Sequence, residues 1–155
     1  MLERAITYRG AVYPWHCDHM GHMNVMWYVG KFDEAHWNLA SELGLTTTYM
    51  RTRNRLMVAV DQRIAYRREV MAGGVVLIES ATLGLRNSSI RFLHRMRNAE
   101  TRELVALTVL TGVHLDAATR RSCPLPEDVR NAVQSALVDD PDRWSGWPLP
   151  SSLLE

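Results

Sequence analysis

The chain has 155 residues, 46% of them hydrophobic, which is enough for one domain with a sizeable core and too little for two ordinary domains. Its 18 Lys and Arg nearly balance its 17 Asp and Glu, so the net charge of +1 gives no reason to expect nucleic acid or an anionic membrane as a partner. The sequence has two cysteines, no apolar run in its first ten residues that could serve as a signal peptide, and no run of roughly 20 apolar residues. We therefore expect a soluble protein of the reducing cytoplasm.

The N-terminal part of the sequence predicts a strand, a loop and one long helix. Residues 4–15 alternate small or apolar side chains with polar ones, as a strand does, and Pro14 marks its end. After a loop at residues 16–24, apolar residues recur every three or four positions, which predicts a helix of about 19 residues with Asn24 as its N-cap and Gly44 just beyond its end. The apolar stripe of this helix is formed by Tyr28, Phe32, Ala35, Leu39 and Leu43.

Four further strands are predicted at residues 57–70, 75–85, 90–96 and 104–116, with polar or glycine-containing turns between them. In the first of these strands, the expected apolar face consists of Val58, Val60, Ile64 and Tyr66. In the third, the alternation gives a face made of Ile90, Phe92, His94 and Met96.

This order of elements predicts an α+β domain, in which a curved antiparallel sheet of about five strands wraps around one long central helix. We assign the domain to residues 1–125. Residues 126–155 are expected to add a short C-terminal helix near residues 127–137 and an extended tail, of which residues 139–152 are read as a loosely tethered arm.

Reactive groups are most concentrated in the loop before the long helix, which reads WHCDHMGHMN at residues 15–24. A helix N-terminus presents unpaired N–H groups and the positive end of the helix dipole, so amides near Asn24 and Val25 can hold an oxyanion. The carboxylate of Asp18 can then attack a carbonyl or activate a water, while Gly21 lets the backbone approach a substrate closely. The simpler alternative is that Asp18 only caps the turn or the helix.

The run DHMGHMN at residues 18–24, followed by Tyr28, resembles the D-x-x-G-H-x-N-x-x-x-Y signature of hotdog thioesterases, in the branch of 4-hydroxybenzoyl-CoA thioesterase and bacterial acyl-CoA thioesterases. Further matches at residues 42–45, 64–66 and 86–89 extend the resemblance over about residues 6–116. The resemblance implies hydrolysis of an acyl-CoA thioester without a cofactor, with Asp18 as nucleophile or general base. It places the oxyanion hole in the loop and helix start, where the candidate residues are Gly21, His22, Asn24 and Val25.

Candidate substrate contacts follow from the same resemblance. Tyr28 completes the signature, and Arg86 and Ser89 belong to a turn that often carries basic residues for the coenzyme A phosphates in the resembling enzymes. In this sequence the two middle positions of the turn are neutral. Alternative phosphate contacts, each also expected as an ordinary solvated strand residue, are Arg67, Arg68 and Arg91.

Other uses of the loop stay open at the level of sequence. His16, Asp18, His19 and His22 offer metal ligands, although Gly21 disfavours the helical turn that would align them, and we expect no metal. A hotdog hydratase would pair an Asp with a later His, but the Asn-Pro step of the hydratase motif is absent. A non-catalytic acyl-binding module would need Asp18 only as a cap.

The assembly and the acyl pocket are also expected from these features. A single curved sheet leaves an open edge, which pairing with a second copy would complete. We therefore expect a homodimer, or a homotetramer built as a dimer of dimers. The resemblance implies active sites at the dimer interface, with the pantetheine arm running along the neighbouring chain. Residues that could either shape the acyl pocket or fill the core are Met20, Met23, Met26, Trp27 and Trp37.

Overall fold

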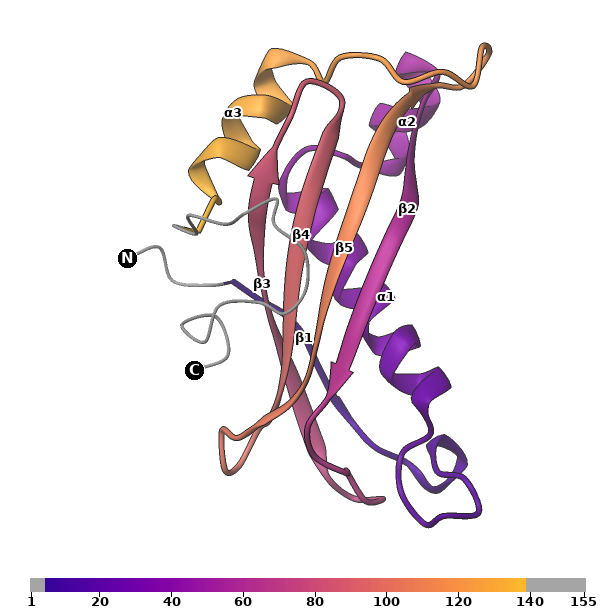
Figure 1. Ribbon diagram of the computed structural model, residues 1–155, viewed down its shortest axis with the longest axis vertical. Coiled ribbons are helices and arrows are strands. Elements are labelled where there is room, and N and C mark those ends of the chain that lie inside the picture. Colours follow the sequence, from indigo (N-terminus) through magenta and orange to yellow (C-terminus); the bar gives the residue numbers. More distant parts are fainter. Residues whose placement is uncertain (1–4, 139–155) are drawn as a thin grey trace.

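The computed structural model describes residues 5–138, which form one curved antiparallel sheet packed against a long helix (Figure 1). The strands are β1 (Ala5–Ala11), β2 (Arg55–Tyr66), β3 (Val75–Leu85), β4 (Ser89–Asn98) and β5 (Leu104–Asp116). Their order in the sheet is β1-β3-β4-β5-β2, and every neighbouring pair is antiparallel. The predicted α+β class and five-stranded curved sheet are confirmed.

The central helix α1 (Val25–Glu42) begins and ends where the sequence predicts. The Asn24 side chain accepts a hydrogen bond from Met26 N, which makes Asn24 the N-cap. Gly44 follows the helix with a φ of +88°, a left-handed conformation that favours glycine and stops the helix. All five residues of the predicted apolar stripe are buried.

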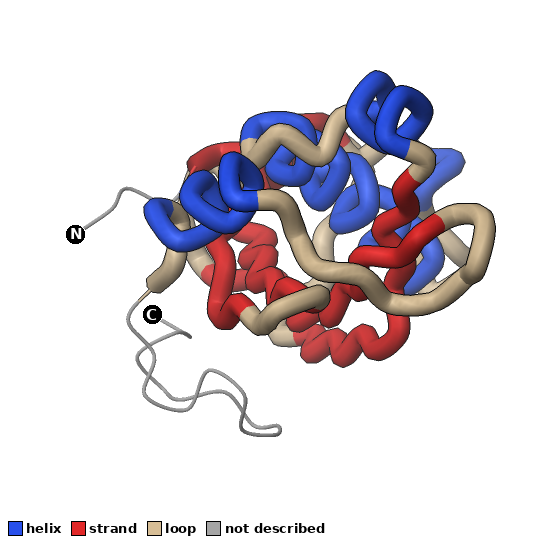
Figure 2. Tube along the Cα trace, turned by 90° about the horizontal axis from the view of Figure 1, so that it is seen from above, coloured by secondary structure: helices blue, strands red, loops and turns tan. Residues whose placement is uncertain are grey.

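The sheet curves around one side of α1, so one face of each inner strand contributes to a core shared with the helix (Figure 2). Phe32 and Ala35 of α1 pack in this core with Ile78 of β3 and Met96 of β4. The face predicted for β4 is buried at Ile90, Phe92, His94 and Met96, but burial does not alternate along the strand, because Arg91, Leu93 and Arg95 on its other face are buried as well.

The predicted apolar face of β2 is correct at Ile64, which packs against the core, and at Tyr66, which packs against Tyr28, but it is wrong at Val60, where a β-bulge changes the phase of the strand. The pairing with β5 shifts by one residue between Ala59 and Asp61, which leaves Val60 as the extra residue and 60% exposed. Met57 precedes the bulge and Gln62 follows it, and both face the helix. The strict alternation that was predicted through Val58 and Val60 is therefore interrupted at the bulge.

Three short elements flank the sheet and α1. Two of them, the 3₁₀ turn η1 (Pro14–His16) and the helix α2 (Thr47–Arg53), were not predicted from the sequence. Helix α2 starts at a Thr46 side-chain cap and ends at Asn54 in a left-handed conformation. The expected C-terminal helix is present as α3 (Glu127–Ser135), with Val129 and Val133 buried in the core. The arm predicted at residues 139–152 lies outside the described residues.

The other face of the sheet carries a second buried cluster, formed by Leu83, Leu93, Leu107 and Val109. Arg91 is only 7% exposed, so the expectation of an ordinary solvated strand residue is wrong for it. Arg67 and Arg68 are exposed, as expected. No helix within residues 5–138 is long and apolar enough to cross a membrane.

Candidate active site

The loop between η1 and α1 is a tight turn closed by its own backbone. Asp18 N donates to His22 O at 3.1 Å, and Gly21 N donates to Asp18 O at 3.0 Å. Gly21 has a φ of +89°, a value that side chains other than glycine adopt only with strain. Met23 is buried in the core and its N donates to Val70 O, so the turn is attached to the domain immediately after its tip.

The carboxylate of Asp18 is held at the N-terminus of α1 by two hydrogen bonds. Its Oδ2 accepts from the side-chain amide of Asn24 at 2.8 Å, and its Oδ1 accepts from Met20 N at 2.9 Å. The bond from Asn24, and then the bond from Met20, lower the pKa of Asp18 below its usual value. Asp18 is therefore ionised at neutral pH and has a fixed orientation.

Backbone amides in the first turn of α1 differ in whether they are free to bind a substrate. Asn24 N already donates to His16 O, Met26 N to Asn24 Oδ1 and Trp27 N to Asn24 O, each at 2.9 Å. Within residues 5–138, Val25 N has no hydrogen-bond acceptor. The open N–H at the positive end of the helix dipole is thus that of Val25.

The histidines of the loop point to different partners. His16 is buried, its Nδ1 accepts from Tyr13 N at 3.0 Å, and its ring lies 4.5 Å from the Trp27 ring between centroids. Burial, and then the charge of Lys31, lower the pKa of His16. His22 Nε2 lies 3.4 Å from a carboxylate oxygen of Glu69, while His19 is exposed.

The imidazole of His16 therefore anchors the loop to α1. In the described part of the chain, no three His, Cys, Asp or Glu side chains are placed to hold a metal ion.

Tyr28 is a core residue in this structure. Its hydroxyl donates to Arg68 O at 3.0 Å, its ring packs edge-on against Tyr66, and burial raises its pKa to about 12. The hydroxyl connects α1 to the segment that follows β2, and its hydrogen bond goes to Arg68 and not to the Asp18 carboxylate.

The structure does not bring Arg86 and Ser89 together with Asp18 in one chain. Arg86 lies in the β3–β4 turn beside α3, where its carbonyl accepts from Arg130. The Asp18 loop is attached to Val70, beyond the opposite ends of the strands. The ten-residue strand β4 separates the two ends of the sheet by roughly 30 Å.

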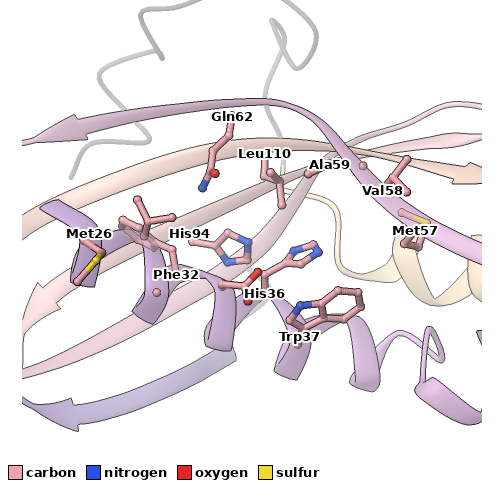
Figure 3. A pocket seen from close by; sticks show the side chains of 14 residues that line it. Met26, Phe32, His36, Trp37, Met57, Val58, Ala59, Gln62, His94 and Leu110 are labelled. Atoms are coloured by element: carbon pink, nitrogen blue, oxygen red, sulfur yellow. The ribbon is translucent and has the colours of Figure 1, made fainter.

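A pocket of about 410 Å³ lies between α1 and the strands β2 and β5 (Figure 3). Met26 and Val29, from the first two turns of α1, line it near the helix N-terminus. Trp37 lines it about two turns further along, and Leu110 lines it from β5. Of the hydrophobic residues singled out from the sequence, Met26 and Trp37 thus line a pocket and Met23 fills the core.

Two imidazoles that were not predicted to belong to a site also line this pocket. His36 of α1 and His94 of β4 have ring centroids 5.6 Å apart and perpendicular planes. Burial lowers the pKa of both, and that of His94 falls to about 3, so both rings are neutral at physiological pH. The signals in the sequence were a histidine in the apolar alternation of β4 and another histidine four residues after Phe32 on the apolar stripe.

A family model described as thioesterase-like superfamily matches residues 12–133, which include the Asp18 loop, α1 and all strands after β1. The chain belongs to the thioesterase-like superfamily. Its hotdog fold and this membership together identify a thioester hydrolase. No curated protein sequence matches this thioesterase.

Solved structures have the same fold as this thioesterase at low sequence identity. A 1,4-dihydroxy-2-naphthoyl-CoA thioesterase from Synechocystis is 18% identical with a TM-score of 0.75, covering 83% of this chain and 95% of its own. The protein SAV2348 from Staphylococcus aureus, in complex with CoA, is 14% identical with a TM-score of 0.81, and the match covers 97% of this chain and 98% of SAV2348. A thioesterase from Thermus thermophilus, complexed with coenzyme A and Zn, is 22% identical with a TM-score of 0.73, and the match covers 88% of this chain and 96% of the Thermus chain.

Proposed function

We propose that this thioesterase hydrolyses an acyl-CoA thioester, with Asp18 as its catalytic carboxylate and Val25 N–H as an oxyanion donor. The proposal is carried by one observation: an ionised carboxylate, fixed by Asn24 and Met20, lies at a helix N-terminus where the N–H of Val25 is open. Coenzyme A as the carrier is supported by the two structural relatives whose complexes contain it.

The reaction requires a carboxylate and an oxyanion site that both act on the same thioester carbonyl of the substrate. Asp18 either adds to the carbonyl carbon, giving an anhydride that water then hydrolyses, or takes a proton from the attacking water. In both routes, negative charge develops on the carbonyl oxygen, where Val25 N–H and the dipole of α1 stabilise it. The oxyanion then collapses and the C–S bond breaks, which gives the anhydride in the first route and the free acid in the second, while the thiolate of coenzyme A leaves and takes up a proton.

The active form is proposed to be a homodimer, or a dimer of dimers, that pairs copies along β2. This edge strand has twelve residues, and its Val60 side chain is 60% exposed at the bulge. The adjacent face of α1 exposes Met26 at 62% and Trp37 at 44%. A long edge strand with exposed apolar neighbours is a surface that proteins usually cover. In such a dimer, Arg86 and Ser89 would act on the substrate only from the partner copy.

The deciding experiment measures thiol release from short, medium, long-chain and aromatic acyl-CoAs, with and without a chelator. For Asp18→Asn we expect turnover to fall by roughly a factor of 10³ or more, since the amide can neither attack nor accept a proton. Asp116→Asn is the matched control. Asp116 also accepts backbone hydrogen bonds that lower its pKa, but it lies at the end of β5 beside Arg55.

Each outcome assigns a role. Turnover that survives chelation, persists in Asp116→Asn and disappears in Asp18→Asn supports a carboxylate-dependent hydrolase. Full activity in a folded Asp18→Asn protein would remove Asp18 from the mechanism. No turnover of any thioester by the wild type would leave an acyl-binding role or hydration of an enoyl-CoA.

A further inference from the structure

Two side-chain nitrogens in the pocket wall lack hydrogen-bond partners. His94 Nε2 and His36 Nδ1 are both buried, and neither has a partner within the described residues. His94 is 1% exposed and His36 is 8% exposed, so bulk water does not replace the missing partners. A buried polar atom without a partner is costly, and where such an atom lines a pocket, a bound group can supply the partner.

The opposite edge of the His94 ring is already occupied. Its Nδ1 lies 2.6 Å from Ser80 Oγ, and Ser80 Oγ lies 2.6 Å from Thr7 Oγ1. This buried chain of hydroxyls fixes the ring orientation through β3 and β1. His94 therefore presents only its Nε2 edge toward α1 and the pocket, next to the ring of His36 (Figure 3).

We propose that the pocket holds the acyl group of the substrate and that His36 and His94 recognise a hydroxyl carried on that group, far from the thioester. This inference rests on the proposed acyl-CoA hydrolysis and adds the substrate class to it: extended, otherwise apolar acyl groups with a remote hydroxyl.

A hydroxyl fits this site better than other polar groups. Each neutral imidazole has one donor and one acceptor nitrogen, and a hydroxyl can pair with either, whichever tautomer the Ser80 contact selects. A carboxylate on the acyl group is disfavoured. The charged side chain among the residues that line the pocket is Asp33, which would repel it, and no Lys or Arg lines the pocket to pair with it. A plain hydrocarbon fills the apolar walls but leaves both nitrogens unpaired.

The length of the pocket places the hydroxyl far from the reacting carbonyl. Val25 and His36 are eleven residues apart on α1, which corresponds to roughly 16 Å along the helix axis. A single aromatic ring on the thioester carbonyl is too short to reach the two histidines. A medium-length chain reaches them, and a volume of about 410 Å³ falls in the usual range of ligand pockets.

The test compares matched acyl-CoA pairs that differ only by a terminal hydroxyl: octanoyl with ω-hydroxyoctanoyl, and decanoyl with ω-hydroxydecanoyl. For the wild type, we expect kcat/KM to be roughly 10- to 100-fold higher for the hydroxylated member of at least one pair, mainly through KM, because the contact is remote from the reacting carbon. For His94→Phe, and separately for His36→Phe, that ratio is expected to fall to about one.

His114→Phe is the matched control. His114 is as deeply buried in the same sheet, but its nitrogens face Tyr49 and Cys123, outside the pocket. The His114→Phe variant should be less stable but keep the wild-type ratio of kcat/KM between hydroxylated and plain acyl-CoAs. It therefore separates the effect of losing any buried imidazole from the effect of losing hydroxyl recognition in the pocket.

The ratio distinguishes failure of this inference from failure of the proposed function. Wild-type turnover with equal kcat/KM for both members of each pair overturns the hydroxyl recognition and leaves the hydrolase standing. An unchanged preference in both His94→Phe and His36→Phe also overturns it. If the wild type turns over no thioester, binding of the same pairs is followed by the ¹⁵N shifts of the histidine side chains. A His36 or His94 response specific to the hydroxylated members then supports the inference, and equal shifts overturn it.

Discussion

The side-chain amide of Asn24 lies 2.8 Å from Oδ2 of Asp18, while the carbonyl oxygen of the same side chain accepts from Met26 N and caps α1. One residue therefore stabilises the helix start and orients the carboxylate in front of it. Because the two interactions use different atoms of Asn24, substitutions can separate them.

We predict that Asn24→Ser keeps the N-cap of α1 and loses activity. Serine is about as good an N-cap as asparagine, but it has no amide to donate to Asp18, so kcat should fall roughly 10- to 100-fold. Asn24→Ala removes both functions and should also lower the free energy of unfolding by about 1 kcal/mol. Urea unfolding and thiol release check the pair; a Ser variant with wild-type kcat would show that the amide does not position Asp18.

The pH profile of the enzyme should reflect the lowered pKa of Asp18. Since the hydrogen bonds from Asn24 and Met20 favour the carboxylate, the ionised form persists as pH falls through the ordinary range of an aspartate. The same shift stabilises the folded state above the unfolded-state pKa, and this contribution is lost as pH falls through the lower, folded-state pKa. We expect kcat/KM to show no acidic limb from Asp18 between pH 8 and about pH 4.5.

The variant Asn24→Ser supplies the check on that assignment. Loss of the largest cause of the shift should raise the pKa of Asp18 and move the acidic limb to higher pH. Circular dichroism at each pH ensures that the limb reports titration and not unfolding. An acidic limb that is identical in both proteins would assign it to another group.

Gly21 should be the least replaceable residue of the loop for conformational reasons. A Cβ at this position meets no atom within 4 Å, so the cost of Gly21→Ala comes from the φ of +89° alone. We expect a loss of about 1 to 2 kcal/mol, and a smaller loss for Gly21→Asn, because asparagine tolerates left-handed conformations better. Thermal unfolding measures both variants, and equal losses would contradict an origin in backbone strain.

Tyr28 is predicted to act on stability and not on substrate binding. Tyr28→Phe removes the hydrogen bond to Arg68 O and should lower the free energy of unfolding by about 1 kcal/mol, with KM unchanged. Urea unfolding and kinetics on one acyl-CoA test this. A severalfold rise in KM at unchanged stability would restore the substrate contact expected from the signature.

The proposed dimer predicts different effects at the two edges of the sheet. Val60→Lys, on β2, should shift the protein toward monomer and lower activity, because it places a charge in the proposed interface. Ile6→Lys is the matched control on the other edge strand, β1, where Ile6 is 55% exposed. Light scattering after gel filtration measures the assembly; dissociation by Ile6→Lys and not by Val60→Lys would place the interface at β1.

Much of the secondary structure and the Asp18 loop followed from local signals in the sequence. The stripe from Tyr28 to Leu43, the cap at Asn24 and the glycine after the helix specify α1, because each acts within one or two turns. Helix α2 was missed, since its seven residues include none that is fully buried and so carry no apolar period. The prediction for β2 was wrong at Val60 for a related reason: the bulge there depends on pairing with β5, which lies far away in the chain.

The sequence alone determined the candidate carboxylate, because the residues that hold Asp18 are its neighbours between Asp18 and Asn24. Only the tertiary structure decided that the Tyr28 hydroxyl binds Arg68 O, that Arg86 lies at the far end of the sheet, and that His36 meets His94 in one pocket. Periodicity reports whether a side chain faces inward, but not which distant side chain it meets there. That depends on strand order, register and the packing of α1 against the sheet, which are fixed by contacts between residues far apart in the sequence.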